Sequence, residues 1–154
     1  EEEERRKQAI WAEFSENSLG TGEKPWSRCF GRKNSCSGGC SEIKINGSLH
    51  SDVLVILKRN NVVKRHAYIA AGNSYTFEIP NGTWQPFFYY GEGWYPKKEM
   101  ESSSCESLMG GFLEGEQWDK DLADDLNDVI ITYTLTSVRD GNFQTKNSNQ
   151  KEAL

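Results

Sequence analysis

The chain has 154 residues, enough for one domain with a substantial apolar core. Its formal net charge of −5 excludes a general affinity for nucleic acid, because phosphate groups require a basic protein surface. No apolar run reaches the length of about 18 residues that a transmembrane helix needs. Aromatic residues make up 12% of the chain and only two methionines occur, a composition that favours β-structure.

Residues 1–14, EEEERRKQAIWAEF, carry opposite charges one helical turn apart, as in Glu2 and Arg6. This spacing predicts an exposed, charged helix that serves as an arm or linker. The segment has no initiator Met and no signal peptide, so we keep a processed end and an upstream membrane anchor as expectations. The remainder is expected to form a single domain over residues 15–145 and a polar tail over residues 146–154.

Five stretches between residues 41 and 90 alternate apolar and polar residues, or are rich in β-branched and aromatic residues, and predict strands. They are residues 41–45, 52–59, 62–69, 75–79 and 83–90. Asn60-Asn61 predicts the tight turn of a hairpin, and Pro80-Asn81-Gly82 predicts a second turn. Pro86 has no backbone N–H, so its strand should lie at a sheet edge or carry a bulge there.

Residues 91–128 contain five glycines and a serine run, which predict a long irregular loop. Trp118, Leu122 and Leu126 are spaced by four residues, which predicts one short helix over residues 119–127. Residues 129–138, VIITYTLTSV, predict another strand, and residues 142–145 are expected to pair back after a turn. Six or seven short antiparallel strands with close turns predict an all-β fold, an antiparallel β-sandwich.

Residues 52–91 follow a recognisable order of strand, turn, strand, Ala-Gly, alternating strand, Pro-x-Gly-Thr-aromatic and strand. The residues that carry this order are Ala71, Gly72, Phe77, Pro80, Gly82, Thr83 and Trp84. The order is similar to that of transthyretin-like and carboxypeptidase-regulatory-like β-sandwich domains of secreted proteins. The chain also resembles uncharacterised bacterial proteins. The first resemblance implies an accessory module without catalysis.

The four cysteines, Cys29, Cys36, Cys40 and Cys105, are compatible with two disulfides, one structural zinc site or free thiols. We expect disulfides Cys36–Cys40 and Cys29–Cys105, because the Ser-Gly-Gly between the first two is supple enough to close a small ring. The CxxC pairs of structural zinc sites are absent. We therefore expect an extracytoplasmic protein, whether secreted, periplasmic or on the cell surface.

The motifs that could carry catalysis or bind metal are incomplete. Residues 21–26, TGEKPW, resemble a zinc-finger linker, but the Cys and His spacing of a finger is missing. Residues 119–128 carry five aspartates but lack the Gly and the terminal Glu of an EF-hand loop. Neither His50 nor His66 stands in a recognisable nucleophile–base pattern. We therefore expect no metal, no cofactor and no catalytic residue.

Two Asn-Gly-Ser/Thr sequences, at Asn46 and Asn81, match the acceptor of N-glycosylation. In a eukaryotic secreted protein they would be candidates for glycans. In a bacterial protein they serve only as turn residues, which is the interpretation that we prefer.

Residues 79–94 hold six aromatic side chains, and strand alternation divides most of them between two faces. Trp84, Phe88 and Tyr90 share one face and are expected in the core. Phe87 and Tyr89 share the other face, which the long loop should cover. Trp94 and Tyr95 follow among glycines and are predicted to be exposed rings that bind a protein or a glycan.

His66 lies in a positive stretch, and alternation places it on the same strand face as Lys64 and Tyr68. The predicted ligand-binding set is therefore Lys64, His66, Tyr68, Trp94 and Tyr95. The predicted function is a non-catalytic extracytoplasmic module that binds a protein or glycan partner. Two alternatives stay open: a small hydrolase with its site between residues 91–128 and the His66 face, and a purely structural spacer.

Overall fold

The computed structural model describes residues 1–136 and 146–154, and it is an all-β sandwich preceded by a helix. Its helices are α1 (Glu2–Phe14), α2 (Ser27–Phe30) and α3 (Gln150–Ala153). Its strands are β1 (Cys40–Asn46), β2 (Asp52–Arg59), β3 (Val62–Ile69), β4 (Ser74–Pro80), β5 (Gly82–Glu99), β6 (Met109–Lys120), β7 (Asp124–Leu126), β8 (Ile130–Thr134) and β9 (Lys146–Asn147). No helix among the described residues combines the length and the apolarity that crossing a bilayer requires.

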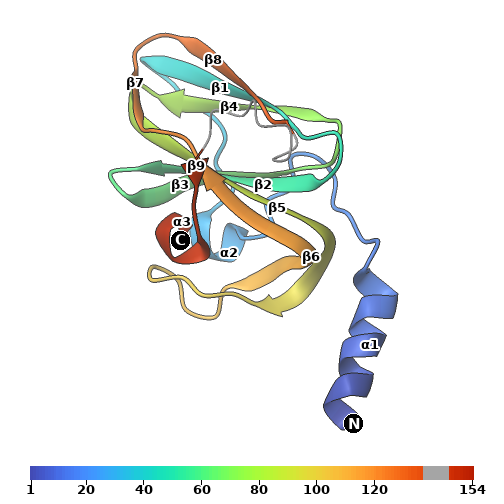
Figure 1. The fold of residues 1–154 in the computed structure, drawn as a ribbon. Helices are drawn as coiled ribbons and strands as arrows, with labels where there is room; N and C mark the ends of the chain where they lie inside the picture. The colour runs from blue at the N-terminus through green and yellow to red at the C-terminus, as the bar shows by residue number, and fades with distance from the viewer. Residues whose placement is uncertain (137–145) are drawn as a thin grey trace.

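The strands form two sheets. The smaller sheet has the order β4-β1-β8, and the larger sheet has the order β3-β2-β5-β6-β9, with β7 paired to the first residues of β5. Neighbouring strands are antiparallel throughout the described residues except for β1 and β8, which run parallel. Figure 1 shows β1, β4 and β8 on one side of the larger sheet and helices α2 and α3 on its other side.

The two sheets enclose the first apolar cluster, here called the inner core. Its buried members are Ile43, Ile45, Val53, Val55, Leu57, Ala67, Ile69, Phe77, Ile79, Trp84, Phe88, Tyr90, Leu126 and Leu135. Every second residue of each contributing strand points into it, as strand geometry requires. The predicted placement of Trp84, Phe88 and Tyr90 in the core is confirmed.

A second apolar cluster, here called the outer core, lies on the opposite face of the larger sheet. Its buried members are Trp26, Leu54, Ile56, Val63, Tyr68, Phe87, Tyr89, Trp94, Met100, Leu108, Phe112, Ala153 and Leu154. The larger sheet is therefore covered on both faces, which explains why β2 is buried from Val53 to Lys58.

The predicted long loop over residues 91–128 is wrong. Strand β5 continues to Glu99 and forms a hairpin with β6, whereas residues 119–127, the predicted helix, belong to β6, a short connection and β7. The glycines misled the prediction because here they bring chain segments together: a Cβ on Gly110, whose φ is +113°, would lie 2.7 Å from the Trp94 ring. Glycine within a strand marks such a close approach as well as a break.

The predicted hairpin turn at Asn60-Asn61 is confirmed, whereas Pro80-Asn81-Gly82 joins β4 of the smaller sheet to β5 of the larger sheet. Asn60 and Asn61 have φ angles of 52° and 63°, the left-handed pair that a two-residue hairpin needs between β2 and β3. Pro86 lies in the gap where β5 passes from pairing with β7 to pairing with β6. The missing N–H of Pro86 thus falls at a break in the ladder.

The C-terminal residues are ordered into the sandwich, which corrects the predicted polar tail over residues 146–154. Strand β9 pairs with β6, and α3 brings Ala153 and Leu154 into the outer core. Both apolar residues at the end of this polar stretch are buried. The predicted strand over residues 129–138 is present as β8, while its last residues and the predicted strand 142–145 lie outside the described residues.

Candidate functional site

The segment between α1 and α2 runs along β3 and protects its edge. The Gly22 N–H donates to the Tyr68 carbonyl at 2.7 Å, and the Tyr68 N–H donates to the Glu23 carbonyl at 2.8 Å. These bonds satisfy backbone groups of an edge strand that would otherwise be open to another chain. This segment together with α2, residues 15–31, is called the strap below, and it carries Trp26 over the outer face of the sheet.

Trp26 closes the outer core. Its backbone N–H donates to Nε2 of His66 at 2.9 Å, and its ring N–H donates to the Gly110 carbonyl at 3.0 Å. Its ring stacks on both His66 and Tyr89, with centroids 6.1 Å apart in each pair. A single side chain from the strap therefore joins β3, β5 and β6.

His66 is a buried, neutral side chain. It is 1% exposed, and burial together with the positive charges of Lys24 and Arg32 lowers its pKa to about 4. Because Nε2 accepts the Trp26 N–H, the proton of the neutral ring lies on Nδ1. His66 is therefore not accessible on the strand face that it was expected to share with Lys64 and Tyr68, since the strap covers it there.

The structure brings two of the predicted ligand-binding residues, Tyr68 and Trp94, into ring contact in the outer core, with centroids 5.5 Å apart, and leaves Lys64 and Tyr95 outside it. Tyr68 is fully buried and Trp94 is 1% exposed, whereas Lys64 is exposed at a bulge in the pairing of β2 with β3, and Tyr95 is half-buried. The prediction that Trp94 is exposed is wrong. The strap explains this: Asn17 exchanges hydrogen bonds with the Trp94 backbone, and Gly93 lies against the end of α1, where a Cβ would be 2.9 Å from the Ser15 carbonyl.

Tyr95 points to the other side of β5 and reaches an open groove. Its ring lies 5.0 Å from that of Phe14, at the end of α1. The groove has a volume of about 800 Å³ and runs between α1 and the hairpin of β5 and β6; it is called the α1 groove below. It is lined by Arg6, Lys7, Ile10, Trp11, Tyr95, Lys97, Lys98, Glu99, Met109 and Leu113.

The α1 groove combines an apolar floor with a cationic rim. Trp11 is 47% exposed and Met109 is 49% exposed, so two large apolar side chains meet solvent within one concave surface. Four cations line the groove against one carboxylate, Glu99, although acidic residues outnumber basic ones in the whole chain, 23 to 18. The local charge is thus opposite to the net charge of the protein.

Lys98 is the one rim cation that the fold itself uses. Its ammonium group lies 2.7 Å from a carboxylate oxygen of Glu116 and donates to the Phe112 carbonyl at 2.6 Å. Arg6, Lys7 and Lys97 make no ion pair within 4.0 Å of any described residue. Three positive charges are therefore available to a ligand.

Sequence reasoning missed the helix wall of this groove. It treated residues 1–14 as a solvated arm, because the charges dominate the segment. The signal was present in Ile10, Trp11 and Phe14, which share one side of α1 at helical spacing. Only Phe14 meets a ring of the sheet, so most of that side stays accessible.

Two other hollows are each lined by a lysine that hydrogen-bonds within the fold. One, of about 750 Å³, lies between the strap and β5, and its Lys24 donates to the Gly22 carbonyl and to the Tyr75 hydroxyl. The other, of about 470 Å³, lies beside α3, where Lys58 donates to the Glu152 carbonyl at 3.0 Å. Burial lowers the pKa of Lys58.

The four cysteines form the two expected disulfides, Cys29–Cys105 and Cys36–Cys40. The first joins α2 to the connection between β5 and β6 and so fastens the strap over the outer core. The second closes a small ring just before β1. Two disulfides indicate an oxidising compartment. They also exclude these cysteines as zinc ligands, and the described residues hold no group of three or more His, Cys, Asp or Glu side chains that could bind a metal.

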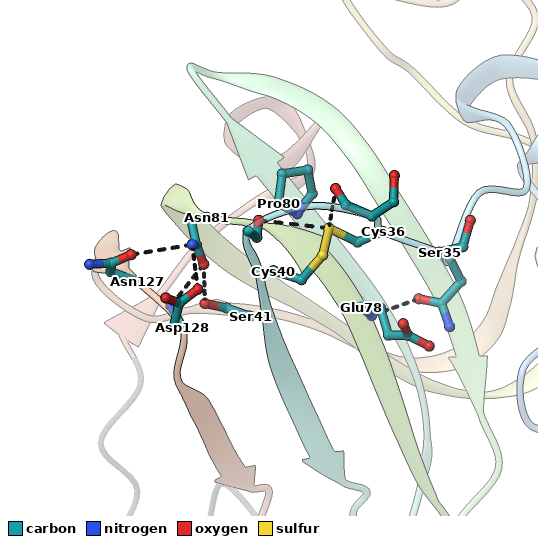
Figure 2. The surroundings of a disulfide bond; sticks show 12 residues. Ser35, Cys36, Cys40, Ser41, Glu78, Pro80, Asn81, Asn127 and Asp128 are labelled. Carbon is teal, nitrogen blue, oxygen red and sulfur yellow. Dashed lines mark hydrogen bonds between the residues drawn. A yellow bond between two sulfur atoms is a disulfide. The ribbon is translucent and has the colours of Figure 1, made fainter.

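Asn81 is a structural residue beside the small disulfide. Its amide donates to Asn127 at 3.2 Å and to Asp128 at 2.8 Å, while its oxygen accepts from Ser41 at 2.7 Å (Figure 2). A glycan on this nitrogen would break the bonds that join β4, β1 and the residues before β8. Asn46 likewise donates to Thr134 at 3.2 Å. Both asparagines act as junction residues.

The elements around His66 differ from those expected for the alternative hydrolase site. Residues 91–128 are mostly strands, and His66 accepts a hydrogen bond from a backbone N–H instead of one from a serine. Its other ring nitrogen has no hydrogen-bond partner within the described residues. A general base needs a nucleophile within hydrogen-bond reach.

No protein-family model, no curated protein and no solved structure matches this chain. The resemblance of residues 52–91 to transthyretin-like domains therefore stays a prediction. These residues do form β2 to β5, as expected from the sequence.

Proposed function

We propose that this chain is a non-catalytic extracytoplasmic binding module, which holds a protein or glycan partner in the α1 groove. The observation that carries the proposal is the half-exposure of Trp11 and Met109 within one concave surface beside Tyr95. Large apolar side chains that gather in an open groove mark interaction sites, because their burial by a partner removes apolar surface from water.

The two disulfides support the proposed location. Both would be reduced in a cytosol, so we infer a secreted, periplasmic or cell-surface protein. The groove volume of about 800 Å³ is within the range of sites that take a small ligand or a few residues of a chain.

Trp11 provides an intrinsic fluorescence probe of the α1 groove. Trp26, Trp84 and Trp94 are at most 2% exposed and Trp118 is half-buried, so Trp11 should supply most of the tryptophan signal that a soluble quencher reaches. A ligand in the groove should protect this signal from acrylamide, and the variant Trp11→Phe should lose it.

The test is a screen of the folded protein against a glycan array and a displayed library of random twelve-residue peptides. The double variant Trp11→Ala/Met109→Ala should lose every specific binder and keep the wild-type melting temperature. The matched control Leu49→Ala/Leu122→Ala removes two side chains that are 76% and 62% exposed outside the groove, and it should keep all binders. Equal binding by both double variants, or no binder of either class, would overturn the proposed function.

A further inference from the structure

The charges and the apolar floor of the α1 groove together select among partners. We propose that the groove binds an acidic peptide segment of another protein, one in which Asp or Glu residues flank an aromatic or aliphatic side chain. This inference rests on the proposed function, because it specifies the ligand class of the same groove.

The cations at the rim of the α1 groove recognise the acidic residues of the peptide. Arg6 and Lys7 lie on the helix wall, and Lys97 lies on the wall formed by β5, so positive charge faces the groove from both sides. None of the three is neutralised by an ion pair with a described residue. Complementary charge raises the rate of encounter and rejects basic partners.

The apolar floor of the α1 groove recognises the aromatic or aliphatic side chain of the peptide. Ile10, Trp11, Met109 and Leu113 offer apolar contact, and a flexible thioether such as Met109 adapts to side chains of different shape. Groove-lining residues of this kind suit an aromatic or aliphatic side chain of a peptide.

The polar groups of the groove argue against a glycan. A sugar carries hydroxyl groups over its whole surface, and each needs a donor or an acceptor when buried. Apart from the Tyr95 hydroxyl and the Trp11 indole N–H, the polar side-chain groups of the lining residues are the four cations and Glu99. A groove with four cations and only two neutral hydrogen-bonding side chains fits carboxylates better than it fits a polyol.

The experiment is a selection from displayed random twelve-residue peptides on the intact, oxidised protein, followed by affinity measurement with the enriched peptides. The groove variant Arg6→Gln/Lys7→Gln/Lys97→Gln removes three charges and keeps residues of good helix propensity on α1. The control Lys33→Gln/Lys44→Gln/Lys151→Gln removes three exposed charges elsewhere, so both variants go from −5 to −8. Circular dichroism and melting temperature verify that both fold.

Enriched peptides should contain Asp or Glu next to an aromatic or aliphatic residue. Their Kd should rise about tenfold or more in the groove variant and stay within about twofold of wild type in the control, since three charge pairs are lost only in the former. Raising the salt concentration should weaken wild-type binding and scarcely affect the groove variant.

Three results would overturn the inference and leave the proposed function standing. They are groove-dependent binding of neutral or basic peptides, groove-dependent binding of an array glycan in place of peptides, and self-association of the protein that the groove variant abolishes. Groove-dependent binding of a phosphatidylglycerol vesicle alone would overturn both the inference and the proposed function. Absence of any binding that the groove variant or Trp11→Ala/Met109→Ala weakens would overturn both.

Discussion

The inner and outer cores share the larger sheet, but they are assembled in different ways. The inner core is built almost entirely from alternating strand residues of two sheets. The outer core joins one face of the same sheet to Trp26 of the strap, Phe112 of the β5–β6 hairpin and Leu154 next to α3. The first follows from local periodicity, whereas the second depends on contacts between residues far apart in the chain. This difference determines how each should respond to perturbation.

The largest effect is expected in the inner core. Phe88 is fully buried, so Phe88→Ala should lower the free energy of unfolding by about 3–5 kcal/mol through lost burial and a residual cavity. Urea denaturation measures this change. Leu49→Ala, at a side chain that is 76% exposed, is the control and should cost less than about 0.5 kcal/mol. A loss below about 1 kcal/mol for Phe88→Ala would contradict the assigned core.

The cover of the outer core can be loosened by opening its disulfide. Cys29→Ser/Cys105→Ser frees a link between residues 76 apart and should destabilise by about 4 kcal/mol, whereas Cys36→Ser/Cys40→Ser, with a separation of 4, should cost about 2 kcal/mol. Amide exchange should accelerate at Gly22 and Tyr68 in the first variant, because the strap unfastens there. If exchange accelerates equally in β1 and β4, the strap is not a separate cover.

Acid should destabilise the outer core through His66. The unfolded chain protonates this ring near its ordinary pKa of 6.5, but the folded protein does so only near pH 4. The unfolded state therefore binds more protons below pH 6.5, and stability falls as the pH drops from 6.5 towards 4. The expected loss between about pH 7.5 and about pH 5 is roughly 2 kcal/mol.

Urea denaturation across this pH range, compared with His66→Gln, isolates the contribution of the histidine. The variant removes the titrating group, so its stability should fall by about 2 kcal/mol less over the same range. Parallel curves for the two proteins would show that His66 is protonated equally in the folded and unfolded states.

The smallest effect on stability is expected in the α1 groove. Trp11→Ala should change the free energy of unfolding by less than about 0.5 kcal/mol, because the side chain is 47% exposed on a helix with no buried residue. In the same variant, the fraction of the tryptophan fluorescence that acrylamide can quench should nevertheless fall to a small part of its wild-type value. A substantial loss of stability would mean that α1 belongs to the outer core.

The strands, turns and inner core were largely predictable from the sequence. Alternation located β1 to β4, Asn60-Asn61 located a hairpin turn, and Phe88 was placed on the correct face. These features depend on neighbours in the chain, where a period of two and a left-handed backbone preference act directly. The pairing of the cysteines was also expected from the sequence, on the flexibility of the Ser-Gly-Gly segment and by elimination.

The course of β5 and β6, the burial of Trp94 and His66, and the α1 groove were decided only by the tertiary structure. Glycines between residues 91 and 115 predict a loop by their local freedom, but here they allow the close approach of Trp94 and the end of α1. His66 and Trp94 are covered because Trp26 and Asn17 arrive from the strap. Such contacts are stabilised by the mutual burial of residues tens of positions apart in the chain. Local propensity carries no information about which distant residues meet. The groove exists for the same reason, since one wall is a helix and the other is a strand more than eighty residues later.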